Sequence, residues 1–306
     1  MSSSIEQYLQ QFQKEKIIYI PDPGNAGDSV MAAATYQIFD RLGLNYSMPR
    51  FQKLAACNLE NYIVIYGGGG NLTGSLERFS SRVAYLVHRR AKRFVILPHT
   101  IKSVTPLLEA FGTNVDIICR ESVSYEYVSS TAPKANVYLM DDIAFSLDVG
   151  DVLAGKPILS PFNRLASFAV SKIFLNTNIP VLEHVLRTFR LKKTKASFND
   201  RLASDELYCF RTDGEKTDIA IPASNVDLSE VFEFGVETKD VAYLSTREVF
   251  SFLSNFKVIH TNRLHMAISG ALLGLDVRFY ANNYYKCRAV YEQTMKDKFK
   301  NVRWME

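Results

Sequence analysis

The segment Lys16–Ser29, KIIYIPDPGNAGDS, decides the class of the fold. It begins with an apolar run of strand length and continues into a turn that contains Gly and Pro. The residues after the turn repeat at helical spacing, with an apolar face made of Val30, Ala33, Ala34, Ile38 and Leu42. A strand that leads through a short turn into an amphipathic helix is typical of α/β proteins, so the segment predicts a parallel sheet.

Further apolar runs continue this alternation toward the middle of the chain. Strands are predicted at Tyr62–Tyr66, at Phe94–Leu97, where Pro98 is expected to end the strand, and at Val115–Cys119 and Val137–Met140. The next helix after the glycine run 67–70 is predicted to have an apolar side that consists of Leu76, Phe79, Val83, Leu86 and Val87. Because strands and helices alternate, the sheet is expected to carry helices on both faces.

A second α/β pattern occupies the last third of the chain. Its predicted strands are Leu207–Phe210, Val258–Ile259 and Val277–Tyr280, and its predicted helices lie at 245–256, after Thr261 and from about Asn283 onward. The stretch 151–205 is less regular and contains two helical patterns and a basic run over 187–195. A chain of 306 residues usually forms two domains, so we expect Rossmann-like domains at 1–150 and 151–306 that face a cleft. Whether the last helix packs back on the first domain is left open.

The bulk composition is that of a globular enzyme, with 47% hydrophobic and 22% charged residues. A net charge of +4 is mild, which disfavours a nucleic-acid partner and suits a small anionic substrate. The four cysteines are scattered and predict neither disulfides nor a metal site. The polar start of the sequence lacks a signal peptide, and no run approaches the roughly 18 apolar residues of a bilayer span. A cytoplasmic protein is therefore expected, with contact at the inner face of the membrane left open.

Polar and cationic residues follow nearly every predicted strand. Ligands of open parallel sheets bind beyond the carboxyl ends of the strands, where helix amino termini favour anions. The residues at these junctions are Asn25 and Asp28, Gly67–Gly70 with Asn71, His99 and Thr100, Arg120 and Glu121, Thr261–His265, and Tyr285 with Lys286.

Each of these groups also has a structural interpretation. Asp28 could simply cap a helix, His99 could be a core histidine, and Arg120 with Glu121 could only begin a helix. Four consecutive glycines lose much backbone entropy on folding. A close approach of the backbone to a ligand would explain why the chain accepts this cost. Arg263 and His265 are expected in the first turn of a helix, where cations oppose the helix dipole unless an anion binds. This last pair is the strongest local signal.

Several common catalytic motifs are absent from the sequence. It contains no GxxxxGK[ST], GxSxG or HExxH element, which disfavours P-loop kinases, serine hydrolases and zinc proteases. The glycine run 67–70 does not fit GxGxxG, because Leu72 and Thr73 follow it, so nicotinamide binding is disfavoured as well. No metal and no cofactor are expected.

Seven segments, in order along the chain, resemble the polysaccharide pyruvyl transferases. They are GNAGDS, YGGGGNL, VILPHTIKS, IICRESVS, YCFRTDGEKT, TNRLHMAISGALLG and NNYYKCRAVYE, and the resemblance is weakest over 150–205. The resemblance implies a GT-B-like fold of two Rossmann-like domains around a central cleft. It also implies transfer of pyruvate from phosphoenolpyruvate to two hydroxyls of a sugar as a ketal, with release of phosphate, in the synthesis of exopolysaccharide, capsule or another cell-surface glycan.

The resemblance assigns roles to individual residues. It implies catalytic roles for His265, Arg263, Glu121, His99 and Asp28. It implies substrate binding by Asn25, Gly68, Gly69, Gly70, Asn71, Arg120, Arg211, Asp213, Asn262, Leu264, Tyr285 and Lys286. His99 stands where relatives commonly carry Gln, and Tyr285 lies directly beside Lys286, which departs from the spacing in relatives.

The donor's carboxylate and phosphate suit Arg and Lys side chains. We expect His265 to protonate the enol carbon and Glu121, Asp28 or His99 to accept a proton from the sugar hydroxyl. The acceptor sugar is unidentified and could be free, lipid-linked or nucleotide-linked. Two alternatives stay open: a GT-B glycosyltransferase that uses a nucleotide sugar, as sialyltransferases do, and a binding protein without catalysis.

Overall fold

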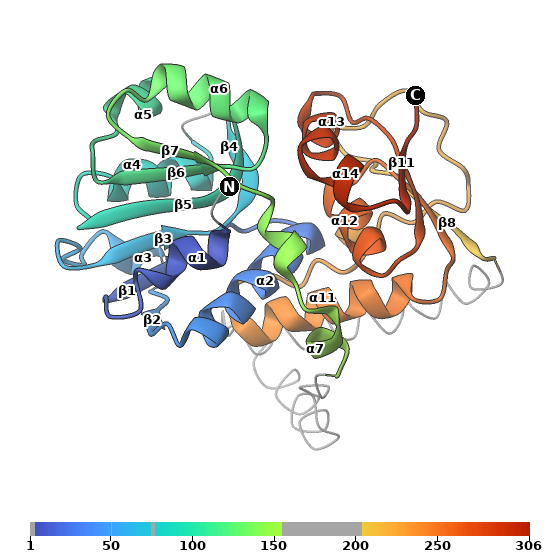
Figure 1. Ribbon diagram of the computed structural model, residues 1–306, viewed down its shortest axis with the longest axis horizontal. Helices are drawn as coiled ribbons and strands as arrows, with labels where there is room; N and C mark the ends of the chain where they lie inside the picture. The colour runs from blue at the N-terminus through green and yellow to red at the C-terminus, as the bar shows by residue number, and fades with distance from the viewer. Residues whose placement is uncertain (1–3, 50, 75–76, 155–203) are drawn as a thin grey trace, which may run out of the picture. The chain divides into compact units, whose positions relative to one another are not determined.

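The computed structural model describes residues 4–49, 51–74, 77–154 and 204–306 (Figure 1). These residues form two units. Unit 1 comprises Met1–Pro23, Met31–Leu147 and Ala281–Lys300, and unit 2 comprises Gly24–Val30, Asp148–Tyr280 and Asn301–Glu306. The segment after Tyr280 therefore returns to the unit that contains the amino-terminal strands. The GT-B arrangement and its central cleft stay predictions of the sequence.

Unit 1 is built on the parallel sheet that the sequence predicted, and this sheet has seven strands. The strand order is β2-β1-β3-β5-β6-β7, and β4 pairs with β5 beside this path. The strand bounds are β1 Ile17–Ile20, β2 Tyr46–Ser47, β3 Ile63–Tyr66, β4 Gly69–Thr73, β5 Arg93–Lys102, β6 Val115–Cys119 and β7 Asn136–Leu139. The strands predicted from the apolar runs are thus present.

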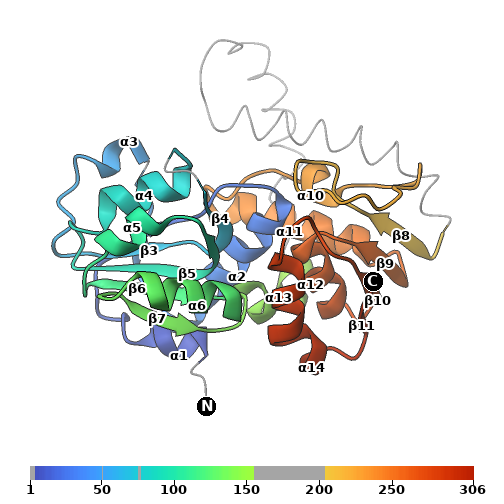
Figure 2. The same ribbon diagram turned by 90° about the horizontal axis from the view of Figure 1, so that it is seen from above.

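Helices cover both faces of this sheet, and α1 and α4 lie on opposite sides of it (Figure 2). The helix bounds are α1 Ile5–Gln10, α2 Ala26–Leu42, α3 Phe51–Leu54, α4 Phe79–Val87, α5 Thr105–Ala110 and α6 Ser122–Thr131, with a 3-10 turn at Ile143–Ser146. The returning segment adds α13 Lys286–Val290, a π-helix at Tyr291–Met295 and α14 Lys296–Lys298. The first turns of α2 belong to unit 2 and the rest of this helix to unit 1.

The period-two alternation of side chains divides the core of unit 1 between the two faces. Val64, Phe94 and Ile117 point toward α4, α5 and α6 and join one buried cluster with them. On the other face, the Tyr19 ring meets the rings of Tyr36 and Phe39 from α2 edge-on. Burial on both faces explains why the strands read as continuous apolar runs.

The third predicted strand is longer than expected, and its predicted end at Pro98 was wrong. β5 continues to Lys102, because β4 supplies it with a further parallel partner beyond Pro98. Pro98 lies where the pairing of β5 with β6 shifts register, between Ile96 and His99, and such an irregularity tolerates the missing N–H. The helix predicted after the glycines is preceded by β4 and begins at Phe79, and Leu76 of its predicted apolar side lies outside the described residues.

Unit 2 contains a parallel sheet of four strands in the order β11-β10-β9-β8. The strand bounds are β8 Glu206–Cys209, β9 Val258–Thr261, β10 Asp276–Phe279 and β11 Val302–Trp304. Its helices are α7 Val149–Ala154, α10 Leu228–Val231, α11 Lys239–Leu253 and α12 Leu264–Leu272. The crossover from β9 through α12 to β10 forms the βαβ unit that the sequence predicted.

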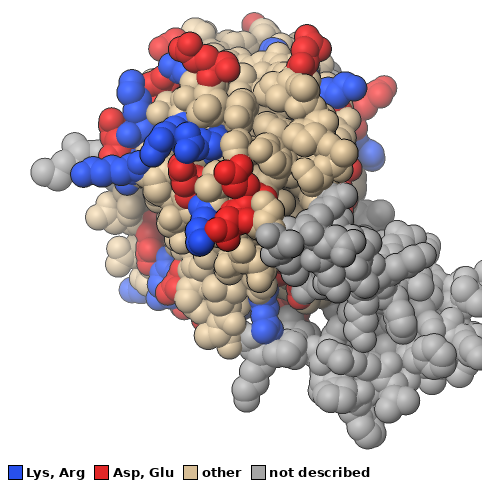
Figure 3. All heavy atoms as spheres, turned by 90° about the vertical axis from the view of Figure 1, so that its right-hand side faces the viewer, with Lys and Arg blue, Asp and Glu red and all other residues tan. Residues whose placement is uncertain are grey.

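Two sequence expectations concern the surface and the membrane. The basic run 187–195 and most of the irregular stretch 151–205 lie outside the described residues. On the face drawn in Figure 3, blue basic and red acidic side chains lie close together, so both signs of charge share this face. Among the helices of the described residues, none combines the length and the apolar character that crossing a bilayer requires.

Candidate functional site

The turn after β1 lies against a histidine of α12, and both the turn and the histidine belong to unit 2. Asn25 accepts a hydrogen bond from the Gly27 N–H at 2.8 Å and so fixes the first turn of α2. A methyl group added at Gly27 would lie 2.5 Å from Nδ1 of His265, which is closer than non-bonded atoms allow. Gly27 is thus required by the close approach of His265, and Asp28 follows it on the same turn. The structure brings together the predicted residues Asn25, Asp28 and His265.

The Gly27→Ala substitution should displace His265 while it leaves unit 2 folded. For the phosphate release from phosphoenolpyruvate that the sequence resemblance implies, we expect kcat to fall about 100-fold, since a misplacement of about 1 Å has effects of that size. Gly150→Ala is the matched control, because its added methyl group meets only the Asp148 side chain, at 3.2 Å. Steady-state kinetics on both variants, with circular dichroism as a check of folding, measures the effect. A wild-type rate for Gly27→Ala would show that the position of His265 is irrelevant.

The four glycines after β3 contact other parts of unit 1. A methyl group added at Gly67 would lie 2.7 Å from the backbone nitrogen of Asp22. One added at Gly68 would lie 3.0 Å from the carbonyl oxygen of Pro98. From Gly69 an added methyl group would meet both Asp22 and His99, at 2.0 and 2.8 Å. Packing of the chain against itself therefore explains the first three glycines, where the sequence had suggested approach to a ligand.

Gly70 is the exception, because it faces two cationic side chains. A methyl group at this position would lie 3.2 Å from Nη2 of Arg120 and 3.9 Å from Nζ of Lys286. The guanidinium and the ammonium thus approach one point beside the backbone. Of the glycine run, Gly70 is the member whose surroundings suit an anion.

A buried polar network surrounds Asp22, which was not among the residues predicted from the sequence. The Tyr66 hydroxyl donates to Asp22 at 2.6 Å, and the Asn71 amide donates to it at 3.2 Å. His99 Nε2 lies 3.7 Å from the same carboxylate. The signal that could have identified Asp22 is its place directly beyond β1, at the same sheet edge as the other candidates.

His99 is fully buried. Its Nε2 accepts the backbone N–H of Leu72 at 3.2 Å, which places the proton of the neutral ring on Nδ1. Burial, and next the positive charge of Arg120, lower the pKa of His99 to about 3. A histidine with this pKa is a weak base, and its Nε2 lone pair is already occupied. These contacts favour a structural role for His99, which holds β4 against β5.

Arg120 and Glu121 follow β6 and make different kinds of contact. Arg120 is buried and donates to Asp142 at 2.7 Å and to the Thr100 hydroxyl at 2.9 Å. Glu121 is the N-cap of α6 and accepts the Ser124 N–H at 2.8 Å and the Ser124 hydroxyl. Burial raises the pKa of Glu121. Glu121 is therefore engaged as a helix cap, while Arg120 keeps one guanidinium nitrogen beside Gly70.

The returning segment places Tyr284, Tyr285 and Lys286 in unit 1. The Tyr285 hydroxyl donates to the Ile101 carbonyl at 3.3 Å, which ties the segment to β5. Burial raises the pKa of Tyr285 to about 12. The ammonium of Lys286 lies 5.0 Å from the centroid of the Tyr284 ring. Lys286 therefore joins Arg120 near Gly70, although the two residues are far apart in the sequence.

Arg263 precedes α12 and is surrounded by carboxylates of unit 2. Its Nε donates to Asp227 at 2.9 Å, its Nη2 donates to Glu230 at 3.2 Å, and its Nη1 lies 2.9 Å from Asp213. Burial alone would lower the pKa of Arg263, but Asp227 and Asp213 raise it. Arg263 is the N-cap rather than a first-turn residue, and its own N–H donates to the Thr261 hydroxyl at 3.0 Å. These contacts hold the start of α12, which carries His265.

Arg211 completes this cluster. It donates to Asp213 at 2.7 and 2.9 Å and to Glu215, and its backbone N–H donates to the Asn262 side chain at 2.8 Å. Burial would raise the pKa of Asp213, but the hydrogen bonds from Arg211 and the Glu215 N–H hold it well below the usual range. Leu264 is buried and packs in the core. Two guanidiniums thus face four carboxylates, which compensate the charge of Arg211 and Arg263 within unit 2; substrate binding by Arg211 and Asp213 stays a prediction.

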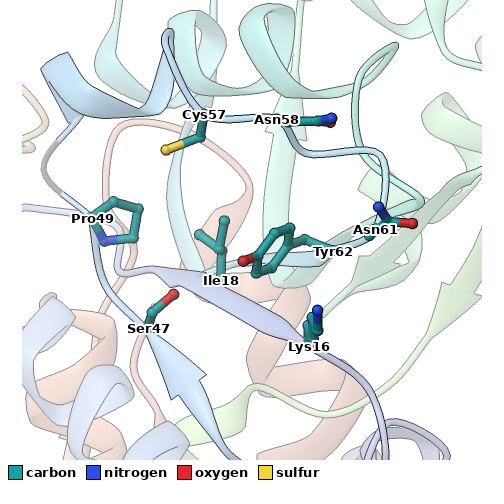
Figure 4. Close-up of a pocket in the computed structure, with 8 residues that line it drawn as sticks. All are labelled: Lys16, Ile18, Ser47, Pro49, Cys57, Asn58, Asn61 and Tyr62. Atoms are coloured by element: carbon teal, nitrogen blue, oxygen red, sulfur yellow. The ribbon is translucent and has the colours of Figure 1, made fainter.

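A separate cavity of about 460 Å³ lies at the other edge of the unit 1 sheet (Figure 4). Its lining includes Lys16, Ser47, Asn61 and Tyr62, close to the starts of β1 and β3. No residue predicted for the site lines it. Within the described part of the chain, no group of His, Cys, Asp and Glu side chains is arranged to hold a metal ion. The four cysteines, all in described segments, form no disulfide, and three of them are buried.

Comparison with known proteins adds two findings. A family model described as polysaccharide pyruvyl transferase matches residues 25–284. The crystal structure of a functionally uncharacterised protein from Klebsiella pneumoniae subsp. pneumoniae is similar over 98% of this chain and 96% of that chain, with a TM-score of 0.74 and 28% sequence identity. No curated protein matches the sequence.

Proposed function

Since the chain belongs to the polysaccharide pyruvyl transferase family, we propose that it transfers a pyruvyl group from phosphoenolpyruvate to two hydroxyls of a sugar, forming a ketal and releasing phosphate. The observation that carries the proposal is the pairing of His265 with the Gly27 turn, beside Asp28. The family match covers both of these elements. A role in the synthesis of exopolysaccharide, capsule or another cell-surface glycan belongs to the same proposal.

Donor binding is assigned to the cations of unit 1. Phosphoenolpyruvate carries a carboxylate and a phosphate, and both groups bind guanidinium and ammonium donors. Arg120 and Lys286 approach the same point beside Gly70, so both cations are available to an anion that binds next to this backbone. The pairing of Arg120 with Asp142 fixes the guanidinium and leaves Nη2 directed at Gly70.

The chemistry begins with proton transfer to the donor. His265, as the imidazolium, gives its proton to the methylene carbon of phosphoenolpyruvate, and the central carbon becomes cationic. One sugar hydroxyl forms a bond to that carbon and gives its proton to a carboxylate. The bond from the central carbon to the phosphate oxygen then breaks, and phosphate leaves. The phosphate takes up the proton that the carboxylate received. The second hydroxyl bonds to the same carbon and gives its proton to His265, which closes the ketal and restores the imidazolium.

Asp28 is the carboxylate best placed to accept the hydroxyl proton. The sequence left Glu121, His99 and Asp28 as alternatives. Glu121 caps α6, and His99 is buried with its Nε2 lone pair occupied. Asp28 is partly exposed and follows Gly27, which touches His265. In this proposal the base Asp28 therefore follows the glycine that the side chain of the acid His265 approaches.

Arg263 receives a positioning role in this proposal. Its guanidinium contacts three carboxylates, and it stands two positions before His265 at the start of α12. Holding the helix start fixes the direction from which the His265 ring reaches the Gly27 turn. The acceptor sugar, whether free, lipid-linked or nucleotide-linked, and action in the cytoplasm at the inner face of the membrane stay proposals from the family resemblance.

A phosphate-release assay with phosphoenolpyruvate tests the proposed function. The acceptors are a panel of free, nucleotide-linked and lipid-linked sugars. Mass spectrometry of the product should show the mass of the acceptor plus one pyruvic acid minus one water, which is the gain for a ketal-linked pyruvate. Shifts in the melting temperature with phosphoenolpyruvate and with cytidine and uridine nucleotides provide a second measurement. Nucleotide binding without any response to phosphoenolpyruvate would replace the proposal with a nucleotide-sugar glycosyltransferase. Binding of phosphoenolpyruvate without turnover on any acceptor would favour a non-catalytic binding protein.

A further inference from the structure

Two buried residues that the proposed reaction does not use hold the chain directly after Gly70. The Asn71 amide donates to the Asp22 carboxylate at 3.2 Å and to the Pro23 carbonyl at 3.1 Å. The Asn71 carbonyl accepts the hydroxyl of Ser80, a residue of α4, at 2.7 Å. Asp22 and Ser80 are both buried. Asn71 is thus fixed through its side chain and also through its peptide group.

Asp22 also contacts the residue before Gly70. A methyl group added at Gly69 would overlap the Asp22 carboxylate and would lie 2.8 Å from Cε1 of His99, so this backbone packs tightly against both side chains. The Tyr66 hydroxyl donates to Asp22 at 2.6 Å and holds the carboxylate in its turn. Asp22 therefore links the ends of β1 and β3 to the first residues of β4.

The place of Gly70 matters because cations lie beside it. A methyl group at this position would lie 3.2 Å from Nη2 of Arg120 and 3.9 Å from Nζ of Lys286. Charge-assisted hydrogen bonds are about 2.7–2.9 Å long, so a shift of this backbone by about 1 Å would decide whether an anion fits between it and the cations. The contacts of Gly69 and Asn71 oppose such a shift.

We propose that Asp22 and Ser80 are positioning residues for an anion site at Gly70. They act on the anion through the backbone of Gly69–Asn71, which they keep at a fixed distance from Arg120. The inference rests on the proposed function for the identity of the anion, which is the carboxylate or the phosphate of phosphoenolpyruvate. Both groups present charged oxygens to the same cations.

Charge and positioning predict opposite effects when the Asp22 carboxylate is neutralised. A carboxylate near an anion site repels the anion, so by charge alone its removal should strengthen binding. If Asp22 positions the backbone, its removal should weaken binding. Asp22→Asn tests this, because asparagine keeps the shape of the side chain but cannot accept hydrogen bonds at both of its terminal atoms.

Asp22→Asn should raise KM for phosphoenolpyruvate about tenfold and weaken the binding of inorganic phosphate by the same factor. The matched control is Asp116→Asn, at the start of β6. Asp116 is also fully buried in unit 1, and it accepts the Tyr8 hydroxyl and the Asn136 amide, the latter at 2.7 Å. Its substitution should lower stability in urea unfolding but leave KM and phosphate affinity within about twofold, because distant sites act independently.

A second pair of variants leaves every charge of the site in place. Ser80→Ala removes the hydroxyl that holds the Asn71 carbonyl, and it should weaken phosphate binding about threefold, the effect of one neutral hydrogen bond. Ser81→Ala is the matched control. Ser81 is the next residue of α4 and is equally buried, but its hydroxyl has no hydrogen-bond partner in the described part of the chain. It should bind phosphate as the wild type does, and this pair decides the question if Asp22→Asn fails to fold.

Calorimetric titration with inorganic phosphate separates this inference from the proposed function. If the wild type releases no phosphate from phosphoenolpyruvate, the proposed function fails, and the phosphate affinities of Asp22→Asn and Ser80→Ala still decide whether these residues position an anion site. If the wild type is active and both variants keep its KM and its phosphate affinity, or bind phosphate more tightly, the positioning roles are refuted and the proposed function stands. A wild type that neither binds phosphate nor turns over phosphoenolpyruvate would refute both.

Discussion

Replacing His265 with Gln should lower kcat for phosphate release by about 100- to 10,000-fold, the range in which general acid–base groups contribute. Glutamine keeps a hydrogen-bonding group of similar size but cannot deliver a proton to the enol carbon. His265 is partly exposed and touches the Gly27 turn, so the substitution opens no large cavity in the core. The loss should therefore appear in kcat, with the melting temperature close to that of the wild type.

His260 provides the control for this experiment. It is another partly buried histidine of unit 2, on β9, and its ring stacks on Tyr208, with Nδ1 3.2 Å from the Tyr280 hydroxyl. His260→Gln should keep the rate of the wild type within about threefold, because the proposed reaction assigns no role to His260 and substitutions away from a site rarely matter more. If His265→Gln also keeps its rate, the assignment of the acid is wrong. An equal loss in both variants would point to a general effect on unit 2.

The Arg263→Ala substitution should reduce the free energy of unfolding by about 3–5 kcal/mol, as expected when one partner of a buried ion pair is removed. Arg263 and Asp227 are both buried, and the guanidinium also contacts Asp213 and Glu230. Without it, the Asp227 carboxylate stays buried without its strongest partner. Urea unfolding, followed by far-UV circular dichroism, measures the change.

Two variants make the cause of this loss identifiable. Adding Asp227→Asn to Arg263→Ala removes the uncompensated charge and should restore part of the stability, as in a double-mutant cycle. Arg278→Ala is the control, because Arg278 pairs with Asp276 at 2.8 Å in a position more exposed than that of Arg263. This substitution should lower the free energy of unfolding by only about 0–1 kcal/mol. A loss below about 1 kcal/mol for Arg263→Ala would show that the carboxylate cluster does not need its guanidinium.

The double variant also tests what Arg263 does in the proposed reaction. If Arg263 only positions α12, the folded double variant should keep KM for phosphoenolpyruvate close to the wild-type value and lose kcat. If Arg263 binds the donor directly, KM should rise by about tenfold or more. The sequence alone could not separate these roles, because it gave no sign that three carboxylates from two different segments contact one guanidinium.

Much of the fold could be predicted because it depends on near neighbours in the chain. The apolar runs predicted β1, β3, β6 and β7, and the helical periodicity after the first turn predicted α2. β4 and the extension of β5 could not be predicted, since each requires the other as a partner. Glycine at 69 is unfavourable in an isolated strand, and it is accepted here because Asp22 and His99 leave no space for a side chain.

The sequence by itself determined the family, the parallel α/β class and the position of polar residues at the ends of strands, because these follow from local periodicity and short motifs. Only the tertiary structure decided which of those residues have partners. It joined Arg263 to Asp227, placed Lys286 with Lys102 around Tyr284, and buried His99 beside Asp22. Ion pairs and desolvation depend on distances across space, which residues far apart in the chain acquire only when the sheet and its connections have formed.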